Sequence, residues 1–311
     1  MLKRVAFAFT AVAFTASALV TCHPAPSTHG VSQTTAIPPA PPLMDWPDLT
    51  SRPRPNPTYT LAVAGAPAAD LWLPSGNGPF PVVLMIHGGC WQKHIADRTL
   101  MNYAAEALRL QGFAVWNIEY RGVDEVGGGY PVTFQDVANA ADALRDLAAR
   151  YPLDLSRVVG FGHSAGGHLI AWLAARPKLP LSSPLHSDTP LPLRGIVMAG
   201  GLPDLHTAPQ GCTGSSVPNL LGAATPTRAD LYADTSPAEL LPLNIPQVSI
   251  NGDGDPVSTP AMAQAYTARA IKAGDHAEAV IVPNAGHVEE ITPGTPIFAR
   301  EVQALQMMSA N

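Results

Sequence analysis

The stretch Val158-Val159-Gly160-Phe161-Gly162-His163-Ser164-Ala165-Gly166-Gly167 lies near the middle of the 311-residue chain. Its first half is an apolar run, typical of a strand that is buried on both faces, and we expect this strand over Arg157–Gly162. A helix is predicted over Ser164–Arg176, because Pro177 cannot continue it. Gly-x-Ser-x-Gly at a strand-to-helix turn predicts that the hydroxyl of Ser164 stands above the sheet as a nucleophile. A glycine-rich structural turn is the alternative.

Strand-like and helical runs alternate on both sides of this stretch. The other predicted strands are Tyr59–Val63, Asp70–Leu73, Val82–His87, Ala114–Glu119, Gly195–Ala199, Gln247–Asn251 and Ala277–Val282. Apolar spacings of three and four predict a helix over Thr133–Arg150, and a last helix is expected over Pro296–Met308. The alternation predicts one α/β domain, residues 58–311, with a mostly parallel sheet covered by helices on both faces. Residues 203–243 break the alternation and are predicted to form a small cap over the ligand-binding edge.

A serine nucleophile requires a base, and the base requires an orienting carboxylate. The segment Gly252-Asp253-Gly254-Asp255 follows a predicted strand, so both carboxylates lie at its carboxyl end. Asp255 is the predicted partner, with Asp253 in reserve, and a turn-capping aspartate is the alternative. His287 follows the last predicted strand in a loop of small residues and is the predicted base. Its place after Ser164 and Asp255 matches one of the known chain orders of such triads.

The segment His87-Gly88-Gly89-Cys90-Trp91 follows another predicted strand. Glycine amides approach a reacting oxygen closely, so Gly88 and Gly89, with the amide of Ala165, are the predicted oxyanion hole. A tight turn that closes the strand is the alternative. Trp91 and His163 are expected to line the substrate pocket, or Trp91 to pack under the loop. No His/Cys spacing is typical of a zinc site, so no metal is predicted.

These motifs together resemble the α/β-hydrolase superfamily over about residues 70–300. The closer resemblance is to the esterase/lipase branch that includes kynurenine formamidase-like and feruloyl-esterase-like proteins. His87–Trp91 fits its H-G-G-x-W pattern, and 251–255 fits the H-G-x-x-D part of H-G-x-x-D-x-x-V, with Asn251 in place of histidine and the carboxylate at Asp255. The resemblance also covers Glu119-Tyr120-Arg121, whose charged residues are expected to form structural ion pairs. It implies hydrolysis of small-molecule carboxylic esters or N-formyl amides through an acyl-enzyme, without a cofactor.

The favoured prediction is an exported esterase that hydrolyses small or aryl esters. An arylformamidase or a peptidase-type hydrolase is the alternative within the same fold. The third hypothesis is a non-enzymatic binding protein with the same fold, but such a protein would not require a complete catalytic triad. The chain has a formal net charge of −6, only four lysines and no basic block, which argues against a nucleic-acid partner.

The first 22 residues are predicted to be a signal peptide of a secreted or periplasmic protein. Lys3 and Arg4 precede an apolar run, 5–20, that is short for a membrane span. Ala16-Ser17-Ala18 offers a peptidase site, whereas Leu19-Val20-Thr21-Cys22 resembles a lipobox that would place a lipid anchor on Cys22. A buried N-terminal helix is the remaining alternative. Residues 23–57 hold ten prolines and are predicted to be an extended linker without chemistry.

Two further cysteines are expected at the same edge of the sheet. Cys90 lies in the predicted oxyanion loop and Cys212 in the predicted cap. In an oxidising compartment a disulfide between them would hold the cap near the site, and two free thiols are the alternative.

Overall fold

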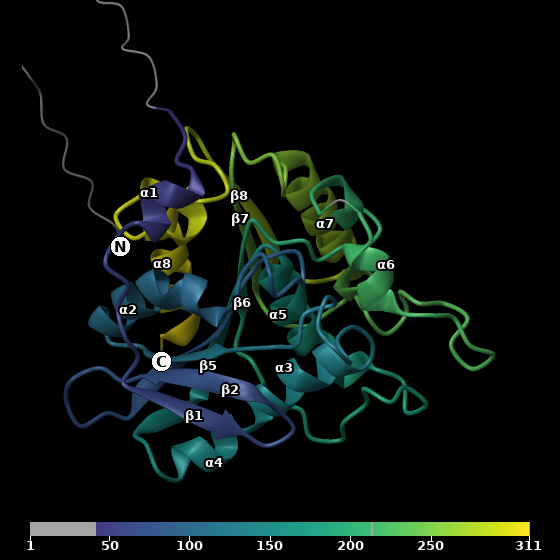
Figure 1. Cartoon of the computed structure of the whole chain (residues 1–311), viewed down its shortest axis with the longest axis horizontal. Helices are drawn as coiled ribbons and strands as arrows, with labels where there is room; N and C mark the ends of the chain where they lie inside the picture. The colour runs from purple at the N-terminus through teal and green to yellow at the C-terminus, as the bar shows by residue number, and fades with distance from the viewer. Residues whose placement is uncertain (1–41, 213, 311) are drawn as a thin grey trace, which may run out of the picture. The chain divides into compact units, whose positions relative to one another are not determined.

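The computed structural model describes residues 42–212 and 214–310. Eight strands form one sheet in the order β1-β2-β4-β3-β5-β6-β7-β8 (Figure 1). The strands are β1 (Tyr59–Val63), β2 (Ala66–Trp72), β3 (Phe80–Ile86), β4 (Ala114–Ile118), β5 (Leu153–His163), β6 (Ile196–Ala199), β7 (Gln247–Gly252) and β8 (Ala277–Val282). β2 pairs antiparallel with β1 and β4, and every later pair is parallel. The predicted mostly parallel α/β sheet is therefore confirmed.

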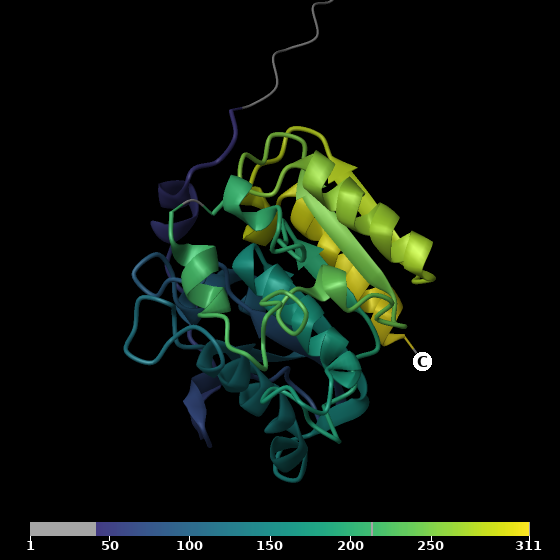
Figure 2. The ribbon, with the colours of Figure 1, turned by 90° about the vertical axis from the view of Figure 1, so that its right-hand side faces the viewer.

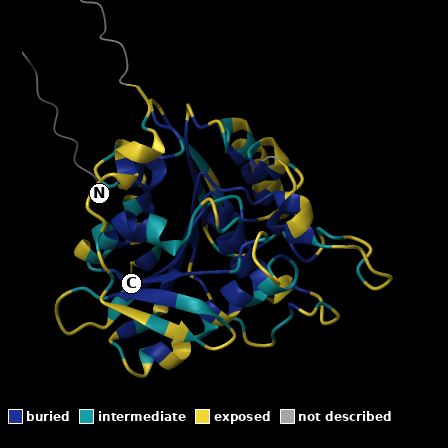
Figure 3. Ribbon diagram, viewed as in Figure 1, coloured by how far each residue is buried: buried dark blue, intermediate teal, exposed yellow. Residues whose placement is uncertain are grey.

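Helices cover both faces of the sheet. They are α1 (Trp46–Thr50), α2 (Asn102–Leu110), α3 (Val132–Asp142), α4 (Leu144–Ala148), α5 (Ala165–Ala175), α6 (Ser216–Leu221), α7 (Pro260–Ala273) and α8 (Pro296–Ser309). Successive side chains of a strand point to opposite faces of the sheet. Val82, Leu84 and Ile86 of β3 therefore pack in one core, which they share with α3 and α5. Its other residues, Val83 and Met85, enter a second core shared with α2 and α8. Figure 3 shows this buried interior, and Figure 2 shows β8 between α7 and α8.

The strands lie close to their predicted ranges, whereas some of the helices differ. The predicted helix over 133–150 is divided into α3 and α4 at Ala143, where ψ is −18°. Its apolar stripe is nevertheless buried, as Phe134 and Leu144 show. α2 and α7 lie between predicted strands, where helices are expected but no bounds are predicted.

The last part of the predicted linker is folded. Residues 46–50 form α1, which begins at the N-cap Asp45, and a capping box joins Asp45 to Asp48. Leu49 is fully buried in the core that α2 and α8 share. The prediction of a linker through residue 57 therefore differs from the structure, because one buried leucine and a capped turn are enough to dock this short segment. The signal peptide, Cys22 and most of the linker lie outside the described residues.

Residues 203–243, the predicted cap, connect β6 to β7 through α6 and short turns. Within the described ranges, 42–212 and 214–310, no helix is both long and apolar enough to cross a membrane.

Candidate active site

Ser164 occupies the turn between β5 and α5. Its φ of +55° and ψ of −120° are strained for a residue with a side chain, and such strain is typical of a nucleophile on a sharp turn. The glycines on either side are sterically required. A Cβ at Gly162 would collide with the carbonyl of Gly166, and one at Gly166 would collide with the carbonyl of Ile86. The local sequence thus fixes the position of the serine hydroxyl.

The predicted base and carboxylate meet above the ends of β7 and β8. Nδ1 of His287 lies 2.8 Å from Oδ2 of Asp255. The other carboxylate oxygen accepts hydrogen bonds from the N–H groups of Val257 and Ser258, at 2.7 and 3.1 Å. Asp253, the reserve candidate, is exposed. The structure therefore brings Asp255, and not Asp253, to the imidazole.

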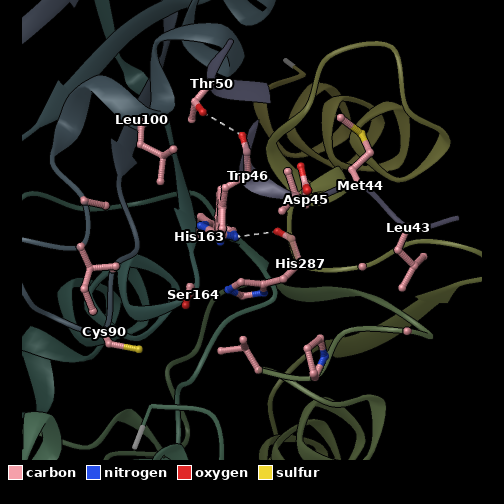
Figure 4. A pocket seen from close by; sticks show the side chains of 18 residues that line it. Leu43, Met44, Asp45, Trp46, Thr50, Cys90, Leu100, His163, Ser164 and His287 are labelled. Carbon is pink, nitrogen blue, oxygen red and sulfur yellow. Dashed lines mark hydrogen bonds between the residues drawn. The ribbon is translucent and has the colours of Figure 1, made fainter. Parts of the chain in front are cut away.

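The imidazole of His287 and the side chain of Ser164 point toward one another (Figure 4). Asp255 engages Nδ1, which leaves Nε2 as the ring nitrogen available to the serine. This is the arrangement that a general base needs, because the carboxylate fixes the tautomer in which Nε2 accepts a proton.

A second carboxylate, which the sequence analysis does not predict, also reaches this imidazole. Glu290 is fully buried, and its Oε2 lies 3.2 Å from Nδ1 of His287. Its Oε1 accepts a hydrogen bond from the N–H of Gly252 at 3.1 Å. The signal in the sequence is its spacing: Glu290 is three residues after His287, on the short 3₁₀ turn Glu289–Ile291.

Burial and charge act in opposite directions on this group of side chains. Burial lowers the pKa of His287, but the hydrogen bonds and negative charges of Asp255 and Glu290 outweigh it, so the pKa is raised. Burial raises the pKa of Glu290 more than the imidazole lowers it. The arrangement favours the imidazolium form that a base generates when it takes up a proton.

His163 contacts the backbone and the ring of the base. Its Nε2 lies 3.1 Å from the carbonyl oxygen of His287, and the two ring centroids are 4.4 Å apart. Burial lowers the pKa of His163 well below its usual value, and the neighbouring charge of His287 lowers it further. His163 also lines the cavity described below, where the sequence analysis places it. As a neutral ring, it positions the loop that carries His287.

The predicted oxyanion loop lies against the serine. A Cβ at Gly88 would lie 2.9 Å from Cβ of Ser164, and Gly89 has a φ of +103° that favours glycine. Ala165 begins α5, where the first N–H groups have no partner inside the helix. Gly88 and Ala165 thus adjoin Ser164, and Gly89 lines the cavity above it, so the oxyanion hole stays a prediction for these three amides.

A buried charged network holds this loop. Nε2 of His87 lies 2.7 Å from Glu119, which Lys93 also contacts. Burial raises the pKa of Glu119, but the charges and hydrogen bonds of His87 and Lys93 lower it to about 2. Arg121 pairs with Asp136 at 2.6 Å. Glu119 and Arg121 therefore form structural ion pairs, as the sequence analysis expects.

Trp91 does not line the substrate cavity, which corrects the first of its two predicted placements. The backbone at Cys90 and Trp91 has positive φ values of 49° and 58°, and the indole is fully buried. Its N–H donates to Nδ1 of His168 at 3.2 Å, and Nε2 of that ring bonds the carbonyl of Thr235 at 2.8 Å. Trp91 thus packs under the loop and connects it to the cap.

A disulfide joins Cys90 to Cys212, with their Cα atoms 5.5 Å apart. It ties the loop after β3 to the segment between β6 and β7. The sequence leaves open a disulfide or two free thiols, and the structure contains the disulfide.

A cavity of about 550 Å³ opens over Ser164 and His287 (Figure 4). Its lining is mostly apolar, and its walls come from the loop after β3, the loops after β7 and β8, and residues 43–50. Among the described residues, one cluster has metal-ligand spacing: His163, His287 and Glu290, whose ligand atoms lie within 4.8 Å of one another. Nε2 of His163 already bonds the carbonyl oxygen of His287, and Nδ1 of His287 bonds Asp255. We therefore assign these three residues to the predicted base and the side chains that position it.

The family model described as BD-FAE matches residues 69–268, which is more than half of the chain. No curated protein matches the chain. Among solved structures, a truncated carbohydrate esterase from gut microbiota is 21% identical with a TM-score of 0.67, and the match covers 81% of this chain and 96% of that one. A bacterial heroin esterase is 21% identical with a TM-score of 0.62, covering 81% and 83%.

A bifunctional GH43-CE protein from Bacteroides eggerthii is also 21% identical, with a TM-score of 0.64 over 79% of this chain, but the chain spans only 36% of that protein's length. At this identity the solved structures show the fold, and the family model adds the membership. The chain belongs to the BD-FAE family of esterase-type α/β-hydrolases.

Proposed function

We propose that the protein is an exported serine esterase that cleaves small or aryl carboxylic esters through an acyl-enzyme on Ser164. One observation carries the proposal: a strained serine turn faces an imidazole whose Nδ1 lies 2.8 Å from a buried carboxylate. The backbone strain at Ser164 and the buried charge of Asp255 both oppose folding. Together they supply the positioned nucleophile and the oriented base that nucleophilic catalysis requires.

In the proposed mechanism His287 Nε2 takes the proton of Ser164 as its Oγ attacks the acyl carbonyl. The amides of Gly88, Gly89 and Ala165 receive the negative charge on the carbonyl oxygen. Collapse of this intermediate breaks the ester C–O bond, and the imidazolium gives its proton to the departing alcohol. A water then attacks the acyl-enzyme with the same base, which releases the acid and restores the serine.

The cavity supports the substrate class. Apart from Asp45, the described residues that line it contribute no aspartate, glutamate, lysine or arginine side chain. A pocket of this size and composition favours a neutral, apolar ester, because its described lining residues include no lysine or arginine that would hold an acidic group.

Export is supported by the disulfide, since such bonds persist in oxidising compartments. The apolar N-terminal run supplies the signal in the sequence. A lipid anchor at Cys22 is the alternative form of the same proposal.

The test uses p-nitrophenyl acetate with matched variants. Ser164→Ala and Asp255→Ala should lose turnover by at least about 10³-fold, because removal of a triad member leaves little beyond the oxyanion hole. Asp253→Ala is the control, since this aspartate is exposed and two residues from the proposed one. Full turnover by folded Ser164→Ala would refute the proposal. Methyl ferulate and N-formylkynurenine, assayed beside the acetate, separate an aryl esterase from an arylformamidase.

A further inference from the structure

Residues 43–50, which we name the strap, form one wall of the cavity over Ser164. Five of its residues line this cavity: Leu43, Met44, Asp45, Trp46 and Thr50 (Figure 4). The strap lies outside residues 69–268, which match the family model. It is therefore a part of the site that the matched segment does not include.

The strap is fixed at both of its ends. The N–H of Met44 donates to Oε1 of Glu289, on the loop that carries the catalytic histidine. Leu49 is fully buried, and just beyond the strap the hydroxyl of Tyr103 on α2 donates to the carbonyl of Arg52 at 3.0 Å. The strap thus crosses from the His287 loop to α2 as a docked element of the site.

Trp46 faces the catalytic centre. Its ring lies edge-on to His163 and His287, with centroid separations of 6.1 and 6.3 Å. It is nevertheless 39% exposed, and two other cavity residues, Leu43 and Ile95, are 44% and 53% exposed. Three large apolar side chains left open to water around one cavity are a surface that a ligand would cover.

The polar side chains of the strap that line the cavity, Asp45 and Thr50, form hydrogen bonds within the strap. Asp45 caps α1, where its Oδ1 accepts from the N–H of Asp48 at 3.1 Å. The hydroxyl of Thr50 donates to the carbonyl of Trp46 at 2.9 Å. The wall therefore presents mainly apolar and aromatic surface toward the cavity, which fits poorly with a sugar hydroxyl or a charged group.

From this geometry we infer that the strap is a substrate-binding wall and that Trp46 is the residue that selects esters with a neutral aromatic group. The aromatic group packs against the indole, beside the serine and the imidazole. This inference rests on the proposed ester hydrolysis, because it concerns the substrate of that site.

The experiment compares small and aromatic esters in the full-length protein. Ethyl acetate and 1-naphthyl acetate vary the alcohol, and ethyl acetate and ethyl benzoate vary the acyl group; a pH-stat gives kcat and KM for each. For Trp46→Ala we expect the preference for the aromatic member of one pair, measured as a ratio of kcat/KM values, to fall about tenfold, mainly through KM. The pair that responds identifies which half of the ester faces the strap.

Two further variants make the result specific. Trp46→Phe keeps an aromatic face and should restore the preference to within about threefold of the wild type. Tyr59→Ala removes another exposed aromatic ring, on β1 and away from the cavity, and should leave the hydrolysis of all three esters unaffected. Thermal unfolding checks that each variant is folded.

The inference is overturned if Trp46→Ala changes small and aromatic esters by the same factor, or changes neither. That failure differs from a failure of the proposed function. If hydrolysis still requires Ser164 while Trp46→Ala leaves the preference intact, only the role of the strap is wrong. If Ser164→Ala hydrolyses every ester at the wild-type rate, the proposed function itself is wrong.

Discussion

Removal of the disulfide should cost the protein a large share of its stability. The bond joins Cys90 and Cys212, which are 122 positions apart. In the chain-entropy description, a closed loop of this length restricts the unfolded chain by about 16 cal/mol/K, or about 5 kcal/mol at 25 °C. Measured losses are commonly 2–5 kcal/mol, so about 5 kcal/mol is the upper value. Because whole domains are stable by only about 5–15 kcal/mol, this loss is easily measured.

The perturbation is Cys90→Ala with Cys212→Ala, in a Cys22→Ala background so that no other thiol can exchange. Alanine is chosen because Cys212 is 1% exposed, and a serine hydroxyl there would add its own cost of burial. Urea unfolding followed by circular dichroism gives the free energy of unfolding with and without dithiothreitol. The parent protein should lose stability in the reductant, and the double variant should not respond to it.

The same bond holds the loop that carries Gly88 and Gly89, so the double variant should also have a lower kcat under conditions where it remains folded. The reasoning is refuted if the parent and the double variant unfold at the same urea concentration and the parent does not respond to dithiothreitol.

Three other perturbations test the surroundings of the site. Glu290→Gln removes one of the two carboxylates that raise the pKa of His287, so the rise of kcat/KM with pH should begin about one to three units lower, and an unchanged pH profile would contradict this. Glu301 is fully buried without a partner for either oxygen, and burial raises its pKa well above the usual value. The folded state therefore binds a proton that the unfolded state releases, so the free energy of unfolding falls as pH rises above about 4.5. Glu301→Gln should raise the free energy of unfolding at pH 8 but not at pH 4. A gain of equal size at both pH values would contradict this explanation. Gly88→Ala keeps the amide N–H but places a Cβ 2.9 Å from that of Ser164, so it should displace this loop and lower kcat about 10²-fold, whereas a normal kcat would contradict the close packing of this glycine against the serine.

The elements that the sequence predicts well are those with short-range signals. Near-continuous apolar runs identify the buried parallel strands, because both faces of such strands meet helices. The residues placed at the site follow from the same logic, since Ser164, Asp255 and His287 each lie in the loop or turn that follows a predicted strand. The carboxyl ends of parallel strands share one edge of the sheet, so residues far apart in the chain are brought together there.

The features that the sequence does not predict depend on contacts between distant segments. The strap docks because Met44 meets Glu289, 245 positions away, and because Leu49 finds a core that only the folded sheet provides. Its helix of five residues is too short to show a period. Trp91 turns inward because two successive residues adopt positive φ, which nothing in their side chains requires.

The central claim is that Ser164 is a nucleophile activated by His287. An active-site-directed fluorophosphonate, followed by peptide mass spectrometry, tests it most directly. We expect one adduct per chain, on Ser164, with labelling that is lost in folded His287→Ala and retained in Asp253→Ala. An adduct on another residue, or the absence of any adduct on protein that hydrolyses p-nitrophenyl acetate, would contradict the account.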